Sequence, residues 1–165
     1  MLPSVWNRWH VSSGLRSVAL VAIDRSIAIN RADFGCLWLM DWDRRELSLL
    51  AHRGFQRSFL ATVERVPFAA GTPSALAAYR RRPVFVGDAC DEELFGTFAP
   101  AARRAGFRSV LSLPMTTARG ALVGILSVYF AAPRTRSDRD IQASTDIAEK
   151  AADQLLRLMA SGRGA

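Results

Sequence analysis

The side chains that most often bind metals or act as nucleophiles and bases are few and scattered in this sequence. It contains two cysteines and two histidines. Cys36 and Cys90 lie far apart and neither belongs to a CxxC pair, so we expect two reduced thiols rather than a metal site or a disulfide. His10 and His52 have no ligand or activating group nearby in the sequence. We therefore expect no metal centre, and the sequence names no cofactor.

The one dense acidic run is Asp91-Glu92-Glu93. Three consecutive carboxylates point in different directions on a helix, and such a run usually marks its first turn. No GxSxG, HExxH or phosphate-loop motif occurs. We expect no catalytic activity.

Composition and charge indicate one globular domain. The chain has 165 residues, of which 50% are hydrophobic and 22% charged, with a net charge of +7. The arginines are spread along the whole chain, and the local runs Arg80–Arg82 and Arg103–Arg104 are short, so we do not expect nucleic-acid binding. No apolar run reaches the roughly 20 residues of a membrane span, and the N-terminus lacks the apolar core of an export signal. We expect a cytoplasmic protein without membrane contact.

Hydrophobic periodicity and turn residues predict an ordered series of elements. The long helices have clear caps: Ser12 or Ser13 before the first, Thr72 followed by Pro73 before a middle helix, and Ser137 before the last. The predicted helices cover 15–30, 55–63, 71–82, a stretch ending at Gly106 and 137–160, and the predicted strands cover 34–41, 47–52, 66–68, 83–88, 108–115 and 122–130.

The central strands are apolar on both faces. Phe34, Cys36, Trp38 and Met40 alternate with Gly35, Leu37 and Leu39, and Leu122–Phe130 shows the same double apolar pattern. Tight hairpins make the strands antiparallel, so helices must cover both faces. The sequence thus predicts an α+β fold: a central antiparallel sheet of five to six strands, with the terminal helices on one face and the middle helices on the other.

This order of elements resembles the GAF domain from about Leu15 to Leu158. The resemblance implies an N-terminal extension over residues 1–14, a single domain over 15–160 and a flexible tail over 161–165. The segments that carry it are RADFGCLWLMD, LLAHRGF, GTPSALAAYRRRPVFVGDACDEELF, RRAGFRSVLSLPM, GALVGILSVYF and PRTRSDRDIQASTDIAEKAADQL.

The resemblance also implies a ligand pocket on the sheet face away from the terminal helices. Phenylalanines at such spacings are more often plain core, and Asp88 is more often a turn cap, so both interpretations stay open. The residues expected to line the pocket are Phe85, Asp88, Phe95, Phe98, Phe107, Ser109 and Leu111.

Three specialised GAF classes lack the residues they need here. Thr97 and Phe98 stand where a bilin-binding domain similar to phytochromes would carry Cys and His. Cys90 is alone in the region where a GAF-fold methionine sulfoxide reductase carries its cysteines. The Asn-Lys-x-x-x-Phe-x-x-x-Asp-Glu pattern of cyclic-nucleotide-binding domains is not found.

GAF domains similar to this one are common in bacterial sensor histidine kinases. The resemblance implies a sensory or regulatory module that binds a small ligand or relays a signal to a protein partner. The alternative is a ligand-free dimerisation or interaction scaffold, and a thiol-based enzyme is a weaker third. In either leading case we expect a homodimer through the helices Leu15–Asn30 and Ile141–Met159, which Leu155→Arg should disrupt. Whether the chain acts alone or as part of a larger sensor stays open.

Overall fold

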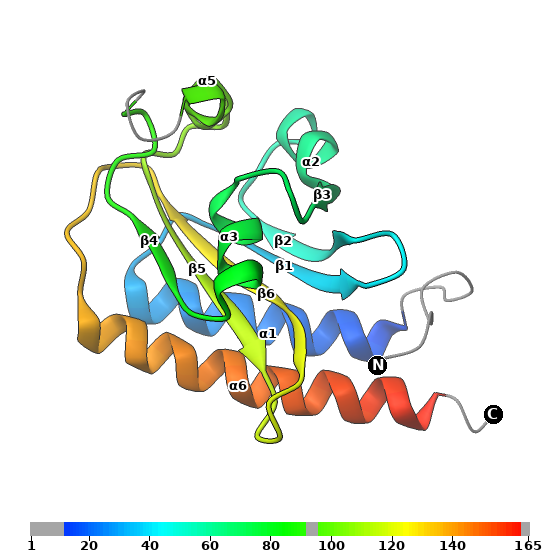
Figure 1. Cartoon of the computed structure of the whole chain (residues 1–165). Coiled ribbons are helices and arrows are strands. Elements are labelled where there is room, and N and C mark those ends of the chain that lie inside the picture. The colour runs from blue at the N-terminus through cyan, green and yellow to red at the C-terminus, as the bar shows by residue number, and fades with distance from the viewer. Residues whose placement is uncertain (1–11, 92–95, 163–165) are drawn as a thin grey trace.

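The computed structural model describes residues 12–91 and 96–162 (Figure 1). His10, Glu92, Glu93 and Phe95 lie outside the described residues, as do most of the predicted N-terminal extension and the last three residues of the tail.

The two long helices begin at the predicted caps. α1 (Ser13–Asn30) has Ser12 as its cap, whose hydroxyl accepts a hydrogen bond from the Leu15 amide at 3.3 Å. α6 (Asp138–Ser161) starts in the same way, with Ser137 accepting from the Asp140 amide at 3.2 Å. The two helices lie side by side across one face of the sheet (Figure 1). No helix of the described part is both long and apolar enough to cross a membrane.

The sheet confirms the predicted fold class. Its six strands are β1 (Phe34–Asp41), β2 (Glu46–Arg53), β3 (Arg65–Pro67), β4 (Val84–Val86), β5 (Ser109–Thr116) and β6 (Leu122–Phe130). They lie in the order β3-β2-β1-β6-β5-β4, and every neighbouring pair is antiparallel. The edge strands β3 and β4 have three residues each, which leaves little open edge for unwanted pairing.

The middle helices cover the opposite face. They are α2 (Arg57–Val63), α3 (Pro73–Arg80) and α5 (Ala99–Ala105), preceded by a 3-10 turn, η1 (Gly96–Phe98). The predicted start of α3 is confirmed, because Thr72 accepts a hydrogen bond from the Ala75 amide at 3.3 Å and Pro73 occupies the first turn.

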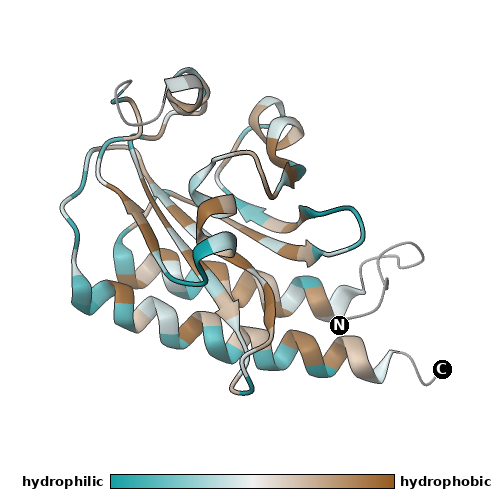
Figure 2. Ribbon diagram, viewed as in Figure 1, coloured by the Kyte–Doolittle hydropathy of each residue, from teal (hydrophilic) through white to brown (hydrophobic). Residues whose placement is uncertain are grey.

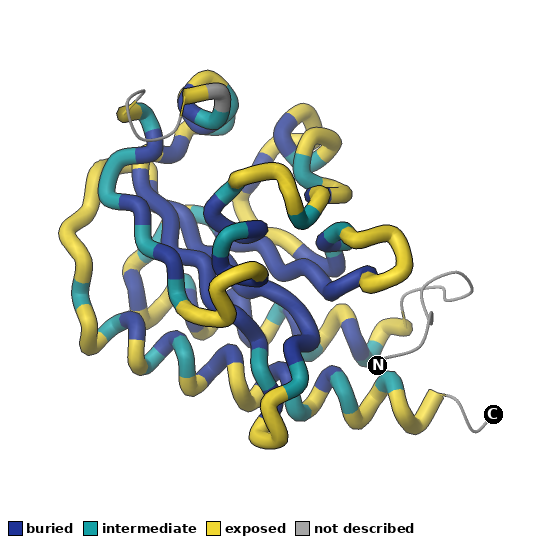
Figure 3. The backbone as a smooth tube through the Cα atoms, in the orientation of Figure 1, coloured by how far each residue is buried: buried dark blue, intermediate teal, exposed yellow. Residues whose placement is uncertain are grey.

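The sheet separates two hydrophobic cores. Leu37 and Leu39 of β1 pack on the α1 and α6 side, whereas Cys36, Trp38 and Met40 pack under the middle helices. All nine residues of β6 are buried, and Figure 3 shows the central strands as a continuous buried layer. Figure 2 shows the same strands as largely apolar, with polar residues along the outer helix surfaces and turns. The predicted double covering of the central strands is therefore confirmed.

One detail of the predicted alternation is wrong at the start of β6. Thr116 pairs with Leu122 and Met115 pairs with Gly124, so Val123 is an extra residue in the ladder. This bulge exchanges the sides of the first two residues: Leu122 packs under the middle helices and Val123 under the terminal ones.

Candidate functional site

A cluster of aromatic rings occupies the space between the sheet and the middle helices. Phe107, two residues before β5, has no exposed surface, and its ring centroid lies 4.8 Å from that of Tyr129 on β6. Phe55 follows β2 and Phe59 lies on α2, with centroids 6.0 Å and 5.8 Å from Phe107. Burial raises the pKa of the Tyr129 hydroxyl well above its ordinary value. These rings fill space that the predicted ligand pocket would need.

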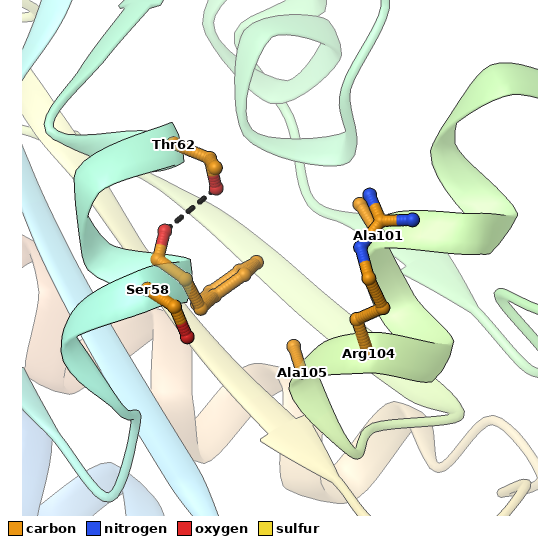
Figure 4. A pocket seen from close by; sticks show the side chains of 6 residues that line it. Ser58, Thr62, Ala101, Arg104 and Ala105 are labelled. Carbon is orange, nitrogen blue, oxygen red and sulfur yellow. Dashed lines mark hydrogen bonds between the residues drawn. The ribbon is translucent and has the colours of Figure 1, made fainter.

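A hollow of about 100 Å³ lies beside this cluster, between α2 and α5. Figure 4 shows Ser58 and Thr62 on one wall and residues of α5 on the other, with the Thr62 hydroxyl donating to the Phe59 carbonyl at 2.6 Å. Pockets for drug-sized ligands usually measure about 300–1,000 Å³. The hollow therefore has room for a small group rather than a large cofactor. Its lining residues are Ser58, Phe59, Thr62, Ala101, Arg104 and Ala105.

Asp88 is a turn cap held by Arg108. The guanidinium of Arg108 donates to both carboxylate oxygens, at 2.9 Å and 2.6 Å, and the Cys90 amide donates to one of them at 3.0 Å. These hydrogen bonds, that of Arg108 first, lower the pKa of Asp88 to about 2. Both oxygens of the Asp88 carboxylate therefore already accept hydrogen bonds, which connect the turn after β4 to the start of β5.

The structure separates the predicted pocket residues. Phe98 and Phe107 do lie together on the middle-helix face, with centroids 5.9 Å apart. Ser109 is buried and donates to the Val86 carbonyl at 2.7 Å, which joins the edge strand β4 to β5. Phe95 lies outside the described residues.

Phe85 and Leu111 are placed on the wrong side of the sheet by the sequence prediction. Both pack on the α1 and α6 side, because antiparallel pairing of β4 with β5 puts these two partners on that face together. With Ile141, they line a cavity of about 20 Å³ near the start of α6, roughly the space of one water molecule. They cannot floor a pocket on the opposite face.

A polar link that sequence analysis missed joins the predicted pocket segment to the terminal helices. The Arg134 amide donates to the Gly87 carbonyl at 3.1 Å, next to Asp88. Its guanidinium lies 4.5 Å from the centroid of the Phe130 ring and donates to the Asn30 carbonyl, the last residue of α1, at 2.8 Å. The Asn30 side chain in turn donates to the Ser144 hydroxyl of α6 at 2.7 Å.

No signal in the sequence singles out this link. Asn30 and Ser144 are 114 residues apart, and each looks like an ordinary polar position of its own helix. Beside them, the Ser26 hydroxyl is buried without a hydrogen-bond partner in the described structure.

The two cysteines differ in setting. Cys36 is buried in the core, and this burial raises the pKa of its thiol. Cys90 is partly exposed, and its carbonyl accepts a hydrogen bond from Arg103 at 3.3 Å. His52 lies on β2, where desolvation and then the nearby Arg16 and Arg53 lower its pKa. Among residues 12–91 and 96–162, no three His, Cys, Asp or Glu side chains are grouped so that they could hold a metal ion.

The apolar stripes of the terminal helices are used mainly inside the monomer. Leu155 has 0% exposed surface and belongs to the core between α6 and the sheet. The apolar residues of α1 and α6 pack both on the sheet and between the two helices. Leu155→Arg would therefore disrupt the fold of each monomer. The prediction that this variant tests dimerisation is wrong.

Comparison with known families and structures agrees with the fold. The GAF domain family model matches residues 12–155. This chain is a GAF domain. A comparison with curated proteins finds no match.

Solved structures with the same fold come from several kinds of bacterial protein. A GAF domain of a phosphoenolpyruvate-protein phosphotransferase from Coxiella burnetii is 19% identical, with a TM-score of 0.76 over 92% of this chain and 88% of that one. A domain assigned to a two-component sensor histidine kinase protein from Sinorhizobium meliloti 1021 is 20% identical, with a TM-score of 0.74 over 92% and 98% of the two chains. The blue-light absorbing PixJ GAF domain of Thermosynechococcus elongatus is 17% identical, with a TM-score of 0.72 over 96% and 94%. At these identities the likeness shows a shared GAF fold.

Proposed function

We propose that this GAF domain is a sensory or regulatory module of the cytoplasm, which relays a change in its middle segment to its terminal helices. The family match supports this role, as does the likeness to a domain assigned to a sensor histidine kinase. We propose no catalytic step for the chain.

The observation that carries the proposal is the position of Arg134. Arg134 donates hydrogen bonds to two backbone carbonyls. That of Gly87 lies at the start of the segment that leads to Phe107, and that of Asn30 lies at the end of α1. Asn30 then reaches α6 through Ser144. A rearrangement of the segment between Gly87 and Phe107 that moves Gly87 would shift Arg134. This shift would bias how α1 and α6 pack. The relay is a population shift between two packings of the same elements.

Two kinds of input fit this relay, and each has an observation in its favour. A small polar ligand fits the hollow between α2 and α5, where Arg104 and Ser58 offer hydrogen-bond donors and the Thr62 hydroxyl oxygen can accept. A ligand-free scaffold, regulated by a protein partner, fits the aromatic cluster that fills the space under the middle helices. We propose the small-ligand sensor as the leading function and the scaffold as the alternative.

For the output, we propose a homodimer through the outer surfaces of α1 and α6. Val21 on α1 is 57% exposed and Leu158 on α6 is 38% exposed, so both apolar side chains are accessible on the outer surfaces of these helices. Leu158 lies near the beginning of α1, because a Cβ on Gly14 would stand 3.8 Å from its Cδ1. A symmetric contact would bury these side chains in both copies.

Native mass spectrometry of the purified protein tests the input and the dimer together. A small molecule released in stoichiometric amount by denaturation supports the sensor, whereas a stable dimer without one supports the scaffold. The variants Val21→Arg and Leu158→Arg should sediment as monomers, and Gln142→Arg, which adds the same charge at an exposed position near the other end of α6, should remain dimeric. An unliganded wild-type monomer would contradict both forms of the proposal.

A further inference from the structure

The arginines of this chain differ in their partners. Several make ion pairs with carboxylates, and these are Arg44, Arg53, Arg65, Arg108 and Arg136. Arg80, Arg81 and Arg82 at the end of α3, and Arg119 in the turn between β5 and β6, have no carboxylate within ion-pair distance among the described residues. All four are exposed.

We call these four arginines, from the end of α3 and the neighbouring β5–β6 turn, the α3 basic patch. Arg81 ends α3 in the left-handed conformation, with φ of 51°, and its guanidinium donates to the Gly120 carbonyl at 3.5 Å. Gly120 follows Arg119, so this contact brings the β5–β6 turn next to the end of α3. Figure 2 shows the end of α3 and the following turn as a strongly polar stretch.

An exposed aromatic side chain adjoins the patch. Tyr79 is 86% exposed, whereas its neighbours Ala77 and Ala78 on α3 are buried. A Tyr ring can bury about 150 Å² or more on contact. Tyr and Arg are also the residue types that are enriched at the energetic centres of protein interfaces. Helix α3 thus presents a ring and several cations together to solvent.

We propose that the α3 basic patch, with Tyr79, is a docking surface for a short acidic segment of a partner protein. The inference goes beyond the proposed sensory function, because it holds whether or not the domain binds a small ligand. An extended carboxylate-bearing peptide can pair with the four guanidinium groups and lay an apolar side chain on the Tyr79 ring.

The surroundings of the patch favour a short peptide over a nucleic acid. On the other side of the same turn, the Ala118 amide donates to the Asp153 carboxylate of α6 at 3.2 Å. Asp146 and Glu149 lie with Asp153 around a shallow hollow there, which Lys150 also lines, so carboxylates outnumber cations in it. A polyanion long enough for the roughly 6–10 phosphate contacts of a typical nucleic-acid site would run into these carboxylates.

The test measures fluorescence anisotropy of a labelled Glu-rich peptide that carries a few leucines, at low and at physiological salt. The double variant Arg80→Glu with Arg82→Glu should weaken binding by about tenfold or more, because each lost ion pair is replaced by repulsion. Tyr79→Ala should weaken it by about fivefold. Arg25→Glu with Arg157→Glu changes the net charge equally on exposed helix positions elsewhere, and should change affinity by less than about twofold.

Four results would overturn the docking surface. They are no binding of the peptide to the wild-type protein at low salt, equal weakening in the two double variants, tighter binding of a single-stranded oligonucleotide of the same charge, and a dimer that Arg80→Glu with Arg82→Glu dissociates. The last would assign the patch to a second copy of this chain. Circular dichroism of each variant establishes that it is folded.

Discussion

The variant Phe107→Ala distinguishes two interpretations of the aromatic cluster: a packed core that stabilises the fold, or the wall of an open pocket. The Phe107 side chain has 0% exposed surface and contacts the rings of Phe55, Phe59, Phe98 and Tyr129. Phe→Ala at a fully buried site typically lowers the free energy of unfolding by about 3–5 kcal/mol, which combines lost transfer energy with the cavity left behind. The many ring contacts place Phe107 toward the upper part of this range.

The assay is urea denaturation followed by circular dichroism. The midpoint should fall while the m-value stays unchanged, because the native state remains as compact as before. For a domain of this size, the loss corresponds to a decrease in Tm of roughly 6–20 °C. Phe98→Ala is the control: Phe98 is only half-buried and, among the residues that the structure describes, its ring contacts one other ring, that of Phe107, so we expect a loss of about 1–2 kcal/mol. A loss below about 1.5 kcal/mol for Phe107→Ala would refute the structural reading and indicate a ring that lines open space.

Two further predictions concern the backbone and the pH dependence. A Cβ on Gly124 would stand 2.1 Å from the carbonyl oxygen of Trp38 on the neighbouring strand, so Gly124→Ala should destabilise the protein by roughly 3 kcal/mol or more. A Cβ on Gly14 of α1 would meet its nearest neighbour, Leu158 Cδ1, at an ordinary contact distance of 3.8 Å, so Gly14→Ala should change stability by no more than about 1 kcal/mol. Similar melting temperatures for the two variants would count against the close strand contact. The pKa of Asp88 is lowered from 3.8 to about 2 by its hydrogen bonds with Arg108, so the pair contributes its full stability above about pH 4 and loses it as the pH falls through 2. The gap in Tm between wild type and Asp88→Asn should therefore close between pH 4 and 2, and a gap that is constant over this range would contradict the assigned cause.

Sequence analysis predicted the elements well because their signals are local. Ser12, Thr72 and Ser137 cap helices where their spacing indicated, and the doubly apolar strands required helices on both faces. The predicted helix and strand ends differ from the structure by a few residues, since pairing partners decide where a strand stops.

The predicted site was less accurate because it depended on which face each strand residue occupies. When both faces of a strand are apolar, the alternation says which residues share a face but not which face that is. Leu111 and Phe85 were assigned to the wrong side for this reason. The link through Arg134 depends on contacts between residues far apart in the sequence, so no local sequence pattern predicts it.

The most direct test of the proposed relay is hydrogen–deuterium exchange of α1 and α6, measured with and without Ala105→Trp in three backgrounds. Ala105→Trp fills the hollow between α2 and α5 and perturbs the middle segment. Arg134→Met keeps an apolar stem near Phe130 but removes the hydrogen bond to Asn30, and Arg136→Met is the control, since Arg136 pairs with the exposed Asp138. We predict that Ala105→Trp changes exchange in α1 and α6 in the wild-type and Arg136→Met backgrounds and not in the Arg134→Met background. The same change in all three backgrounds, or no change in any, would contradict a relay through Arg134.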